Sequence, residues 1–360
     1  MPHDVQRQGK GNLVARALAG SWRSSSSAPF DLTESQLGEV TPLLFGSGAA
    51  ALGWWRVRNT ALRDTPSGEV LQQGYRLQSL QATIQEQNIK KIFRLLRAVS
   101  VEPILAKGWA AANLYPDRAL RAYGDIDLLV TTKDLAQAAE VLQSAEASDC
   151  WVDLHDRFWE LSDRSVDKLF ERSSTLDLDG DQIRVLSEED HLTLLSIHLL
   201  KHGAWRPLWL CDIAAAVEGM PVTFDWSICL GPKQKRATWI LVAIGLAGVV
   251  LDARISHLPF SSKELALPQW LVRSVLKQWD QPIAGNQPPM VHPRPMASFL
   301  RHPSGLWSGL RQRWPNPILA TISVNGSFTD TPRLPYQVGN CLLRTGQFFW
   351  GLPARLQALR

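Results

Sequence analysis

The block between residues 103 and 186 constrains the fold most, because short apolar runs alternate there with segments of helical character. Strands place successive side chains on opposite faces, whereas helices repeat every ~3.6 residues. We expect strands at 104–106, 126–130, 151–155, 174–178 and 182–186, the last two forming a hairpin around Asp179-Gly180-Asp181. Helices are expected at 109–114 and 133–145, the second with Thr132 as its N-cap. The pattern therefore predicts a core of mixed strands and helices over 100–186.

Helical segments are expected on both sides of this core. The apolar residues Ile89, Ile92 and Phe93 gather on one side of a helix, which predicts an N-terminal helical region over 31–99. Ser187 is followed three residues later by an acid, a pattern that caps helices, and opens a second helical domain over 187–280. The remaining predictions are a flexible leader at 1–30 and a Pro-rich connector with a C-terminal helical tail at 281–360.

The composition is that of a globular protein. Hydrophobic residues make up 45% and charged residues 20%, which excludes global disorder. The net charge of +4 suits a phosphate-bearing partner but is too small for a protein that coats nucleic acid. The four cysteines lack metal-ligand spacing, and the amino terminus lacks the apolar region of a signal peptide. We therefore expect a cytoplasmic protein.

One segment, residues 237–251, carries no charged residue and resembles a membrane span. A span needs ~20 apolar residues, and this run is shorter and is closed by Asp252 and Arg254. We interpret it as a buried core helix and expect no association with a membrane.

Acidic residues in two of the expected strands point to a metal site. Asp125 and Asp127 are two residues apart, so in a strand they project from one face, and two like charges so close need a cation. Oxygen ligands at a strand end favour Mg²⁺, although Asp in a turn is also common as a solvated residue. Asp153 lies within an apolar strand, where a carboxylate needs a partner or a metal. Lys107-Gly108 stands at a strand-to-helix turn, a place suited to binding phosphate.

The histidines of the 187–280 domain offer an alternative site. His191, His198 and His202 share one helical face, and the last two have a spacing that suits zinc. A substrate-contacting face, with Lys201 as a phosphate contact, and a packed hydrogen-bonded face are the other interpretations. The run 177–181 imitates a calcium loop, but Gln182 stands where that loop requires glycine.

Several motifs together resemble a known family. The run from Lys107 to Asp117 followed by Arg121-Ala-Tyr-Gly-Asp-Ile-Asp-Leu-Leu-Val130 resembles the uncharacterised nucleotidyltransferase family of the polymerase-β-like superfamily. Further similar pieces are 152–155, 186–191, 199–203 leading to 209–213, and 333–335. The Arg-x-x-Gly-Asp-x-Asp string is the specific part, and the resemblance covers roughly residues 80–260.

The resemblance implies an α+β fold, in which a small mixed β-sheet nucleotidyltransferase core is flanked by N-terminal helices and a C-terminal helical domain. By position, Asp125 and Asp127 would bind two Mg²⁺ ions, and Asp153 would complete the catalytic and metal-binding triad and activate an acceptor hydroxyl. Gly108 would lie against the triphosphate of the nucleotide. Trp109 replaces the small residue that usually follows this glycine, and Lys107 and Arg121 would add positive charge for nucleotide binding.

The expected reaction is Mg²⁺-dependent transfer of NMP from an NTP, such as ATP, to an acceptor hydroxyl with release of pyrophosphate. The acceptor is a small molecule, a peptide or RNA, and the sequence does not indicate an oligomeric state. Two other functions fit the same residues: a catalytically inactive nucleotide- or peptide-binding module, and a toxin-like transferase that acts on RNA or protein.

Overall fold

The computed structural model describes residues 9–24, 30–282 and 314–350, and the following description refers to these residues. A five-stranded mixed sheet lies in the order β3-β2-β1-β5-β4. The strands are β1 (Ile104–Ala106), β2 (Ile126–Leu129), β3 (Val152–His155), β4 (Ser174–Leu178) and β5 (Asp181–Val185). Parallel pairing joins β2 to β3 and β1 to β5, whereas β1–β2 and β4–β5 are antiparallel. The α+β fold and the hairpin are therefore confirmed.

Helices precede the sheet: α1 (Lys10–Leu18), α2 (Glu34–Gly46), α3 (Ala50–Val57), η1 (Ala61–Asp64) and α4 (Pro66–Ala98). The prediction of a flexible leader at 1–30 is wrong for α1, whose Leu13, Val14 and Leu18 are buried. The apolar residues between 11 and 18 form one buried side of a short helix, which precedes the polar serine run.

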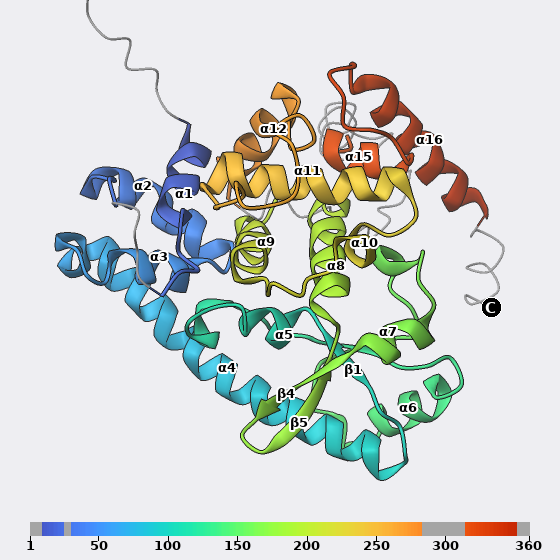
Figure 1. Ribbon diagram of the computed structural model, residues 1–360. Helices are drawn as coiled ribbons and strands as arrows, with labels where there is room; N and C mark the ends of the chain where they lie inside the picture. The colour runs from blue at the N-terminus through green and yellow to red at the C-terminus, as the bar shows by residue number, and fades with distance from the viewer. Residues whose placement is uncertain (1–8, 25–29, 283–313, 351–360) are drawn as a thin grey trace, which may run out of the picture.

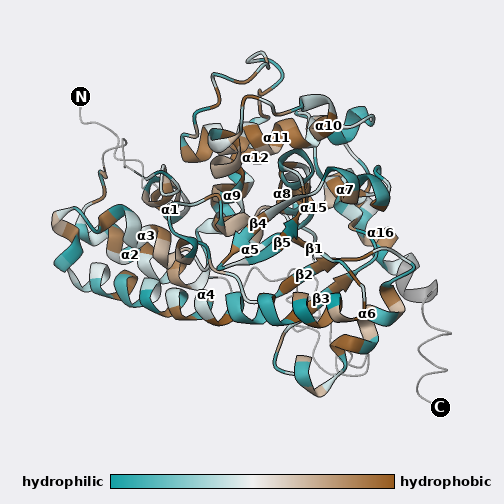
Figure 2. Cartoon of the chain, turned by 60° about the horizontal axis from the view of Figure 1, so that its bottom comes forward, coloured by the Kyte–Doolittle hydropathy of each residue, from teal (hydrophilic) through white to brown (hydrophobic). Residues whose placement is uncertain are grey.

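The long helix α4 covers one face of the sheet and also extends beside α2 and α3 (Figure 1). Its Ile89, Phe93 and Leu96 share a core with Ile126 and Leu128 of β2. Figure 2 shows α4 along this side of the strands, with hydrophobic and hydrophilic residues alternating along it. Since neighbouring strand residues point to opposite faces, Asp127 projects to the other side of the sheet.

Helices after the sheet lie on that other side: α8 (Glu188–Lys201), α9 (Pro207–Gly219), α10 (Trp226–Leu230), α11 (Gln234–Leu251) and α12 (Gln269–Trp279). Ser187 caps α8 as predicted, accepting the Asp190 N–H. These helices and the N-terminal ones share one hydrophobic core, to which Leu52 and Ile244 both belong. The core therefore crosses the predicted boundaries at 99 and 187.

Helix α11 is the one described helix that is long and apolar enough to cross a membrane, and 61% of its apolar window is buried. Trp239, Ile240 and Ile244 are among its buried side chains. The prediction of a buried core helix is confirmed.

Shorter elements connect these layers: α5 (Gly108–Ala112), η2 (Arg118–Leu120), α6 (Leu135–Leu142), η3 (Ala145–Ala147), η4 (Trp159–Leu161) and α7 (Val166–Arg172). Thr132 does not cap α6, because that helix begins later and Asp134 occupies its N-cap position. Most of the predicted Pro-rich connector lies outside the described residues. The predicted tail contains α15 (Pro317–Ser323) and α16 (Leu334–Trp350).

Candidate active site

The pairing of β2 with β3 brings together residues that are distant in sequence. Asp127 lies opposite Asp153, and Leu129 lies opposite His155. Asp153 and His155 are two residues apart and therefore share the face of β3 that carries Asp127 on β2. One ligand atom from each of Asp127, Asp153 and His155 lies within 4.8 Å of the others. In the described part of the chain, this is the one group of three such side chains that could hold a metal ion.

His155 occupies the centre of this group. Its Nε2 lies 3.1 Å from Asp153 Oδ2 and 3.6 Å from Asp127 Oδ1. This nitrogen is buried and makes no aligned hydrogen bond. A ring nitrogen left without a hydrogen-bond partner between two carboxylates fits the donor set of a divalent cation. The residues present therefore fit a bound metal ion.

Asp127 is the buried member of the group, with 3% of its surface exposed. Burial alone would raise the pKa of its carboxyl group, but the His155 imidazole beside it and the nearby Lys107 ammonium outweigh the effect of burial and lower that pKa. The Nζ of Lys107 lies 2.6 Å from Asp127 Oδ1. Asp127 is therefore held as a carboxylate, the form that binds cations.

Asp125 lies in the turn before β2 and is exposed. It does not belong to the group of three potential ligands, so the structure brings together two of the three acids of the predicted triad and adds His155. The backbone of Asp125 lies beside the Lys107-Gly108 turn, because a Cβ placed on Gly108 would lie 3.4 Å from the Asp125 carbonyl oxygen.

The Lys107-Gly108 turn has an unusual backbone. Both residues have positive φ, 51° for Lys107 and 34° for Gly108. The following Trp109 is 1% exposed and belongs to the core on the α4 side, where its Nε1 donates to Glu86 Oε1 at 3.3 Å. The indole therefore packs on the side of the sheet opposite Asp127, and its bulk does not fill the turn.

Arg121 was predicted to bind the nucleotide, but the structure pairs it with an acid of α9. Its guanidinium donates to both carboxylate oxygens of Asp212, with Nη2 2.9 Å from Oδ2, and both side chains are buried. Tyr115 donates to the same carboxylate at 2.8 Å. This network ties the segment before β2 to the helical side of the molecule.

Lys201 also has a carboxylate partner, since its Nζ lies 3.0 Å from Glu160 Oε1. His198 Nδ1 lies 3.5 Å from the same oxygen, and Lys107 and Asp127 are close enough to influence its pKa. The end of α8 therefore lies near the metal-ligand group. His198 and His202 belong to no three-ligand group among the described residues, so the zinc interpretation gains no support.

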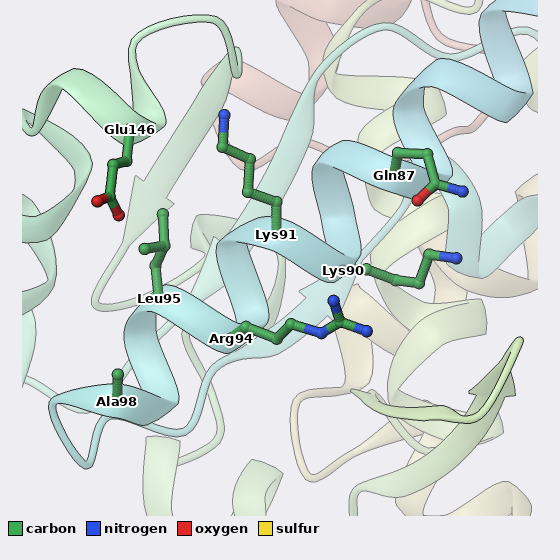
Figure 3. Close-up of a pocket in the computed structure, with 7 residues that line it drawn as sticks. All are labelled: Gln87, Lys90, Lys91, Arg94, Leu95, Ala98 and Glu146. Atoms are coloured by element: carbon green, nitrogen blue, oxygen red, sulfur yellow. The ribbon is translucent and has the colours of Figure 1, made fainter.

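A separate open pocket of about 580 Å³ lies on the outer surface of α4 (Figure 3). Its cations Lys90, Lys91 and Arg94 are each paired with an aspartate, at 3.1, 2.7 and 2.7 Å respectively. The other lining residues are Gln87, Leu95, Ala98 and Glu146. This pocket lies on the side of α4 that faces away from the sheet, and it is separate from the group around Asp127.

His155 was not among the predicted site residues. The signal that identifies it is its spacing from Asp153, because a residue two positions along a strand lies on the same face. That spacing is present in residues 152–155, Val-Asp-Leu-His, but only the pairing of β3 with β2 shows which residue His155 faces.

Comparison with known proteins gives one match. No curated protein and no solved structure matches the chain. A family model described as uncharacterised nucleotidyltransferase matches residues 33–237, which is more than half of the chain. The matched range includes the whole sheet, the three potential metal ligands and the Arg121–Asp212 pair. The chain belongs to the uncharacterised nucleotidyltransferase family.

Proposed function

We propose that this protein is a nucleotidyltransferase that moves NMP from an NTP to an acceptor hydroxyl and releases pyrophosphate. The observation that carries the proposal is the convergence of Asp127, Asp153 and His155 within 4.8 Å in a member of this family. Carboxylates that converge on one face of a strand pair suit a reaction in which phosphate charge must be neutralised.

Asp127, Asp153 and His155 would hold a divalent ion, Mg²⁺ in the proposal, which supplies positive charge to the phosphates and orients them. Asp125 is two residues from Asp127, and we propose that it helps to hold a second ion. Lys107, free to leave Asp127 when a cation binds there, would donate to a phosphate oxygen, and the Gly108 backbone would lie against the triphosphate.

The bond changes follow from this arrangement. The acceptor oxygen attacks the α-phosphorus, and the bond from that phosphorus to the bridging oxygen breaks, so that pyrophosphate leaves with the electron pair. The hydroxyl proton passes to Asp153, which lies on the edge strand β3 and is exposed, so that an acceptor from solvent can reach it.

We propose a positioning role for Arg121, since its guanidinium already faces Asp212. Lys201 remains a proposed phosphate contact that would exchange Glu160 for the nucleotide. The acceptor is a small molecule, a peptide or RNA. The proposal places the protein in the cytoplasm, which its four unpaired cysteines support.

The test is incubation of the protein with labelled NTPs, Mg²⁺ and a cell extract, followed by identification of what becomes labelled. Asp127→Asn should lower the transfer rate by about 100-fold or more, because the buried metal-facing charge is lost. Its melting temperature should fall, because the largely buried Lys107 ammonium loses its counterion, so circular dichroism must show that the variant is folded before its transfer rate is compared. Asp149→Asn, which removes an exposed acid paired with Lys91 beside the α4 pocket, is the matched control and should keep full transfer.

The outcomes separate the alternatives. Metal-dependent NTP binding without transfer to any component of the extract would assign the protein as an inactive binding module. Labelled RNA or labelled protein would support the toxin-like transferase. A wild-type protein that binds no NTP in the presence of Mg²⁺ or Mn²⁺ would show that the proposal is wrong.

A further inference from the structure

A cluster of aromatic side chains lies where α8 turns into α9, and the proposed chemistry does not use it. The ring centroids of His198 and His202 are 4.4 Å apart, and those of Trp205 and Trp209 are 5.2 Å apart. Trp209 joins the two pairs, since its ring lies 4.7 Å from His198 and 5.3 Å from His202. All four side chains are partly exposed, so the cluster is accessible from solvent.

Two sets of contacts place this cluster beside the metal-ligand group. His198 Nδ1 lies 3.5 Å from Glu160 Oε1. Two residues before Glu160, the ring of Phe158 lies 4.6 Å from the His155 ring and 5.3 Å from Lys107 Nζ. A Cβ placed on Gly48 would lie 2.5 Å from Arg206 Nη2 and 3.2 Å from the Ala122 Cβ, so Arg206 lies beside the segment that leads to Asp125. The Arg206 guanidinium lies 5.8 Å from the centre of the Trp209 ring. Trp209 therefore lies between a histidine near Asp127 and an arginine near Asp125.

The cluster has the chemistry of a surface for a flat, uncharged group. Burial, together with the neighbouring His198, lowers the pKa of His202 to about 3, so this ring is neutral at physiological pH. Burial also lowers the pKa of His198, although Glu160 opposes that shift. Neutral aromatic rings that are partly exposed offer stacking faces, and every nucleobase has a face that stacks on them.

Arg206 adds a cation with unused donors. Its Nε donates to the Ser47 carbonyl oxygen at 2.8 Å, while its terminal nitrogens make no hydrogen bond or ion pair within the described ranges. No carboxylate of the described residues lies within ion-pair distance of this guanidinium, and burial and the nearby Arg121 lower its pKa to about 10. An anion that binds beside Trp209 and Asp125 would supply a counterion for Arg206.

We propose that Trp209, with Trp205 and the His198–His202 pair, forms the surface on which the nucleobase of the NTP stacks, while Arg206 donates to its phosphates. The inference rests on the proposed function and extends it, because it assigns the base-binding part of the site. The metal-ligand group holds the reacting end of the NTP, and the α8–α9 corner holds the other end. Stacking of this kind does not distinguish one base from another, so the protein should accept all four NTPs with similar affinity.

The experiment measures binding by calorimetry with the full chain, Mg²⁺, each of the four NTPs and inorganic tripolyphosphate, which lacks a base. Trp209→Ala should weaken the binding of each NTP by about 5- to 140-fold, the range that corresponds to stacking of one base. It should change tripolyphosphate binding by less than about twofold. Trp209→Phe should restore most of the NTP affinity, because it keeps a stacking face. Trp270→Ala is the matched control, since Trp270 packs on Phe328 in the helical region, and it should leave both affinities unchanged.

Four results would overturn the assignment. Unchanged NTP affinity in Trp209→Ala would show that the ring is packing only, or that it serves the acceptor. An equal loss of NTP and tripolyphosphate binding would show that the substitution disturbs the phosphate site. If Trp209→Ala does not fold, Trp205→Ala replaces it, and unchanged NTP affinity there would equally contradict the proposal. A wild-type protein that binds tripolyphosphate and NTPs with equal affinity would contradict the base-binding surface but not the proposed function. A wild-type protein that binds neither ligand would contradict the proposed function itself.

Discussion

Asp127 shows how single residues prepare this site for a cation. Its carboxylate is already neutralised by the Lys107 ammonium at 2.6 Å, and His155 Nε2 lies 3.6 Å away. In the proposed reaction, a divalent ion that binds Asp127 would replace this lysine contact and free the ammonium group for the phosphates. Asp127 would then have a cationic partner both before and after the ion binds, so its buried charge would not be left unpaired.

A residue-scale prediction concerns His155. His155→Ala should weaken binding of Mn²⁺, used as a probe in the absence of nucleotide, by at least about tenfold, because one of three converging donors is lost. Titration calorimetry of the full chain measures this. His257→Ala, which removes an exposed histidine after α11, is the control. Equal Mn²⁺ affinity in the wild type and His155→Ala would remove His155 from the metal site.

At the same scale, the sequence predicted Asp127 from its spacing to Asp125, and Asp153 from its place in an apolar strand, where a charge is costly without a partner. It did not identify His155, because a histidine in a strand has many structural roles and only the pairing of β2 with β3 shows what it faces. Arg121 was found through its motif, but its partner Asp212 is 91 residues away and no local pattern joins them.

At the scale of elements, the strands were predictable because their apolar runs are short and bounded by helix-type segments, and all five occur within a residue or two of the expected positions. Helix ends were less predictable. Thr132 is a good capping residue, but the chain turns once more before α6 begins, with Thr131 donating to Asp134 at 2.6 Å. The helix α1 was missed since a short amphipathic run has weak helical character unless other elements bury it.

An element-scale prediction tests the connection between the segment before β2 and α9. Asp212→Asn leaves the buried Arg121 guanidinium without its counterion, so we expect a loss of roughly 3–5 kcal/mol of unfolding free energy. Denaturant unfolding measures this loss. Asp31→Asn, which breaks the more exposed pair with Arg16, should change stability by less than about 1 kcal/mol. Similar effects of the two substitutions would show that the buried network does not hold these elements together.

At the scale of the whole molecule, the N-terminal helices and the helices after the sheet share one hydrophobic core. Unfolding of either set would expose the other, so we expect a single cooperative transition for both. The family match covers only the middle of this unit, since it begins at α2 and ends near the start of α11, so that α1 and α12 lie outside it. The sequence pattern could not reveal the shared core, since it depends on contacts between distant segments such as α1 and α12.

The pH dependence of global stability follows from buried His191. Burial lowers its pKa from 6.5 to about 4, so between these values the unfolded chain binds more protons than the folded one. Stability contributed by neutral His191 is therefore present above pH 6.5 and is lost as the pH falls toward 4, by up to about 3 kcal/mol. Chemical denaturation from pH 4 to 7 should show this slope. His191→Gln should flatten it, whereas an unchanged slope would assign the acid sensitivity to other groups.

The backbone conformation of Lys107 predicts which residue position 107 accepts when variants are selected for stability or for activity. A lysine with φ of 51° and ψ of −139° occupies a conformation that glycine adopts freely, at a cost on the order of 1–3 kcal/mol. In a library built on Asp127→Asn, where no buried carboxylate depends on Lys107, and selected only for survival on heating, Lys107→Gly should therefore be enriched, and sequencing of the survivors measures this. In a library selected for nucleotidyl transfer it should disappear, because glycine lacks the ammonium group that faces Asp127. The backbone conformation at position 107 thus favours glycine, whereas the ion pair with Asp127 and the proposed phosphate contact favour lysine.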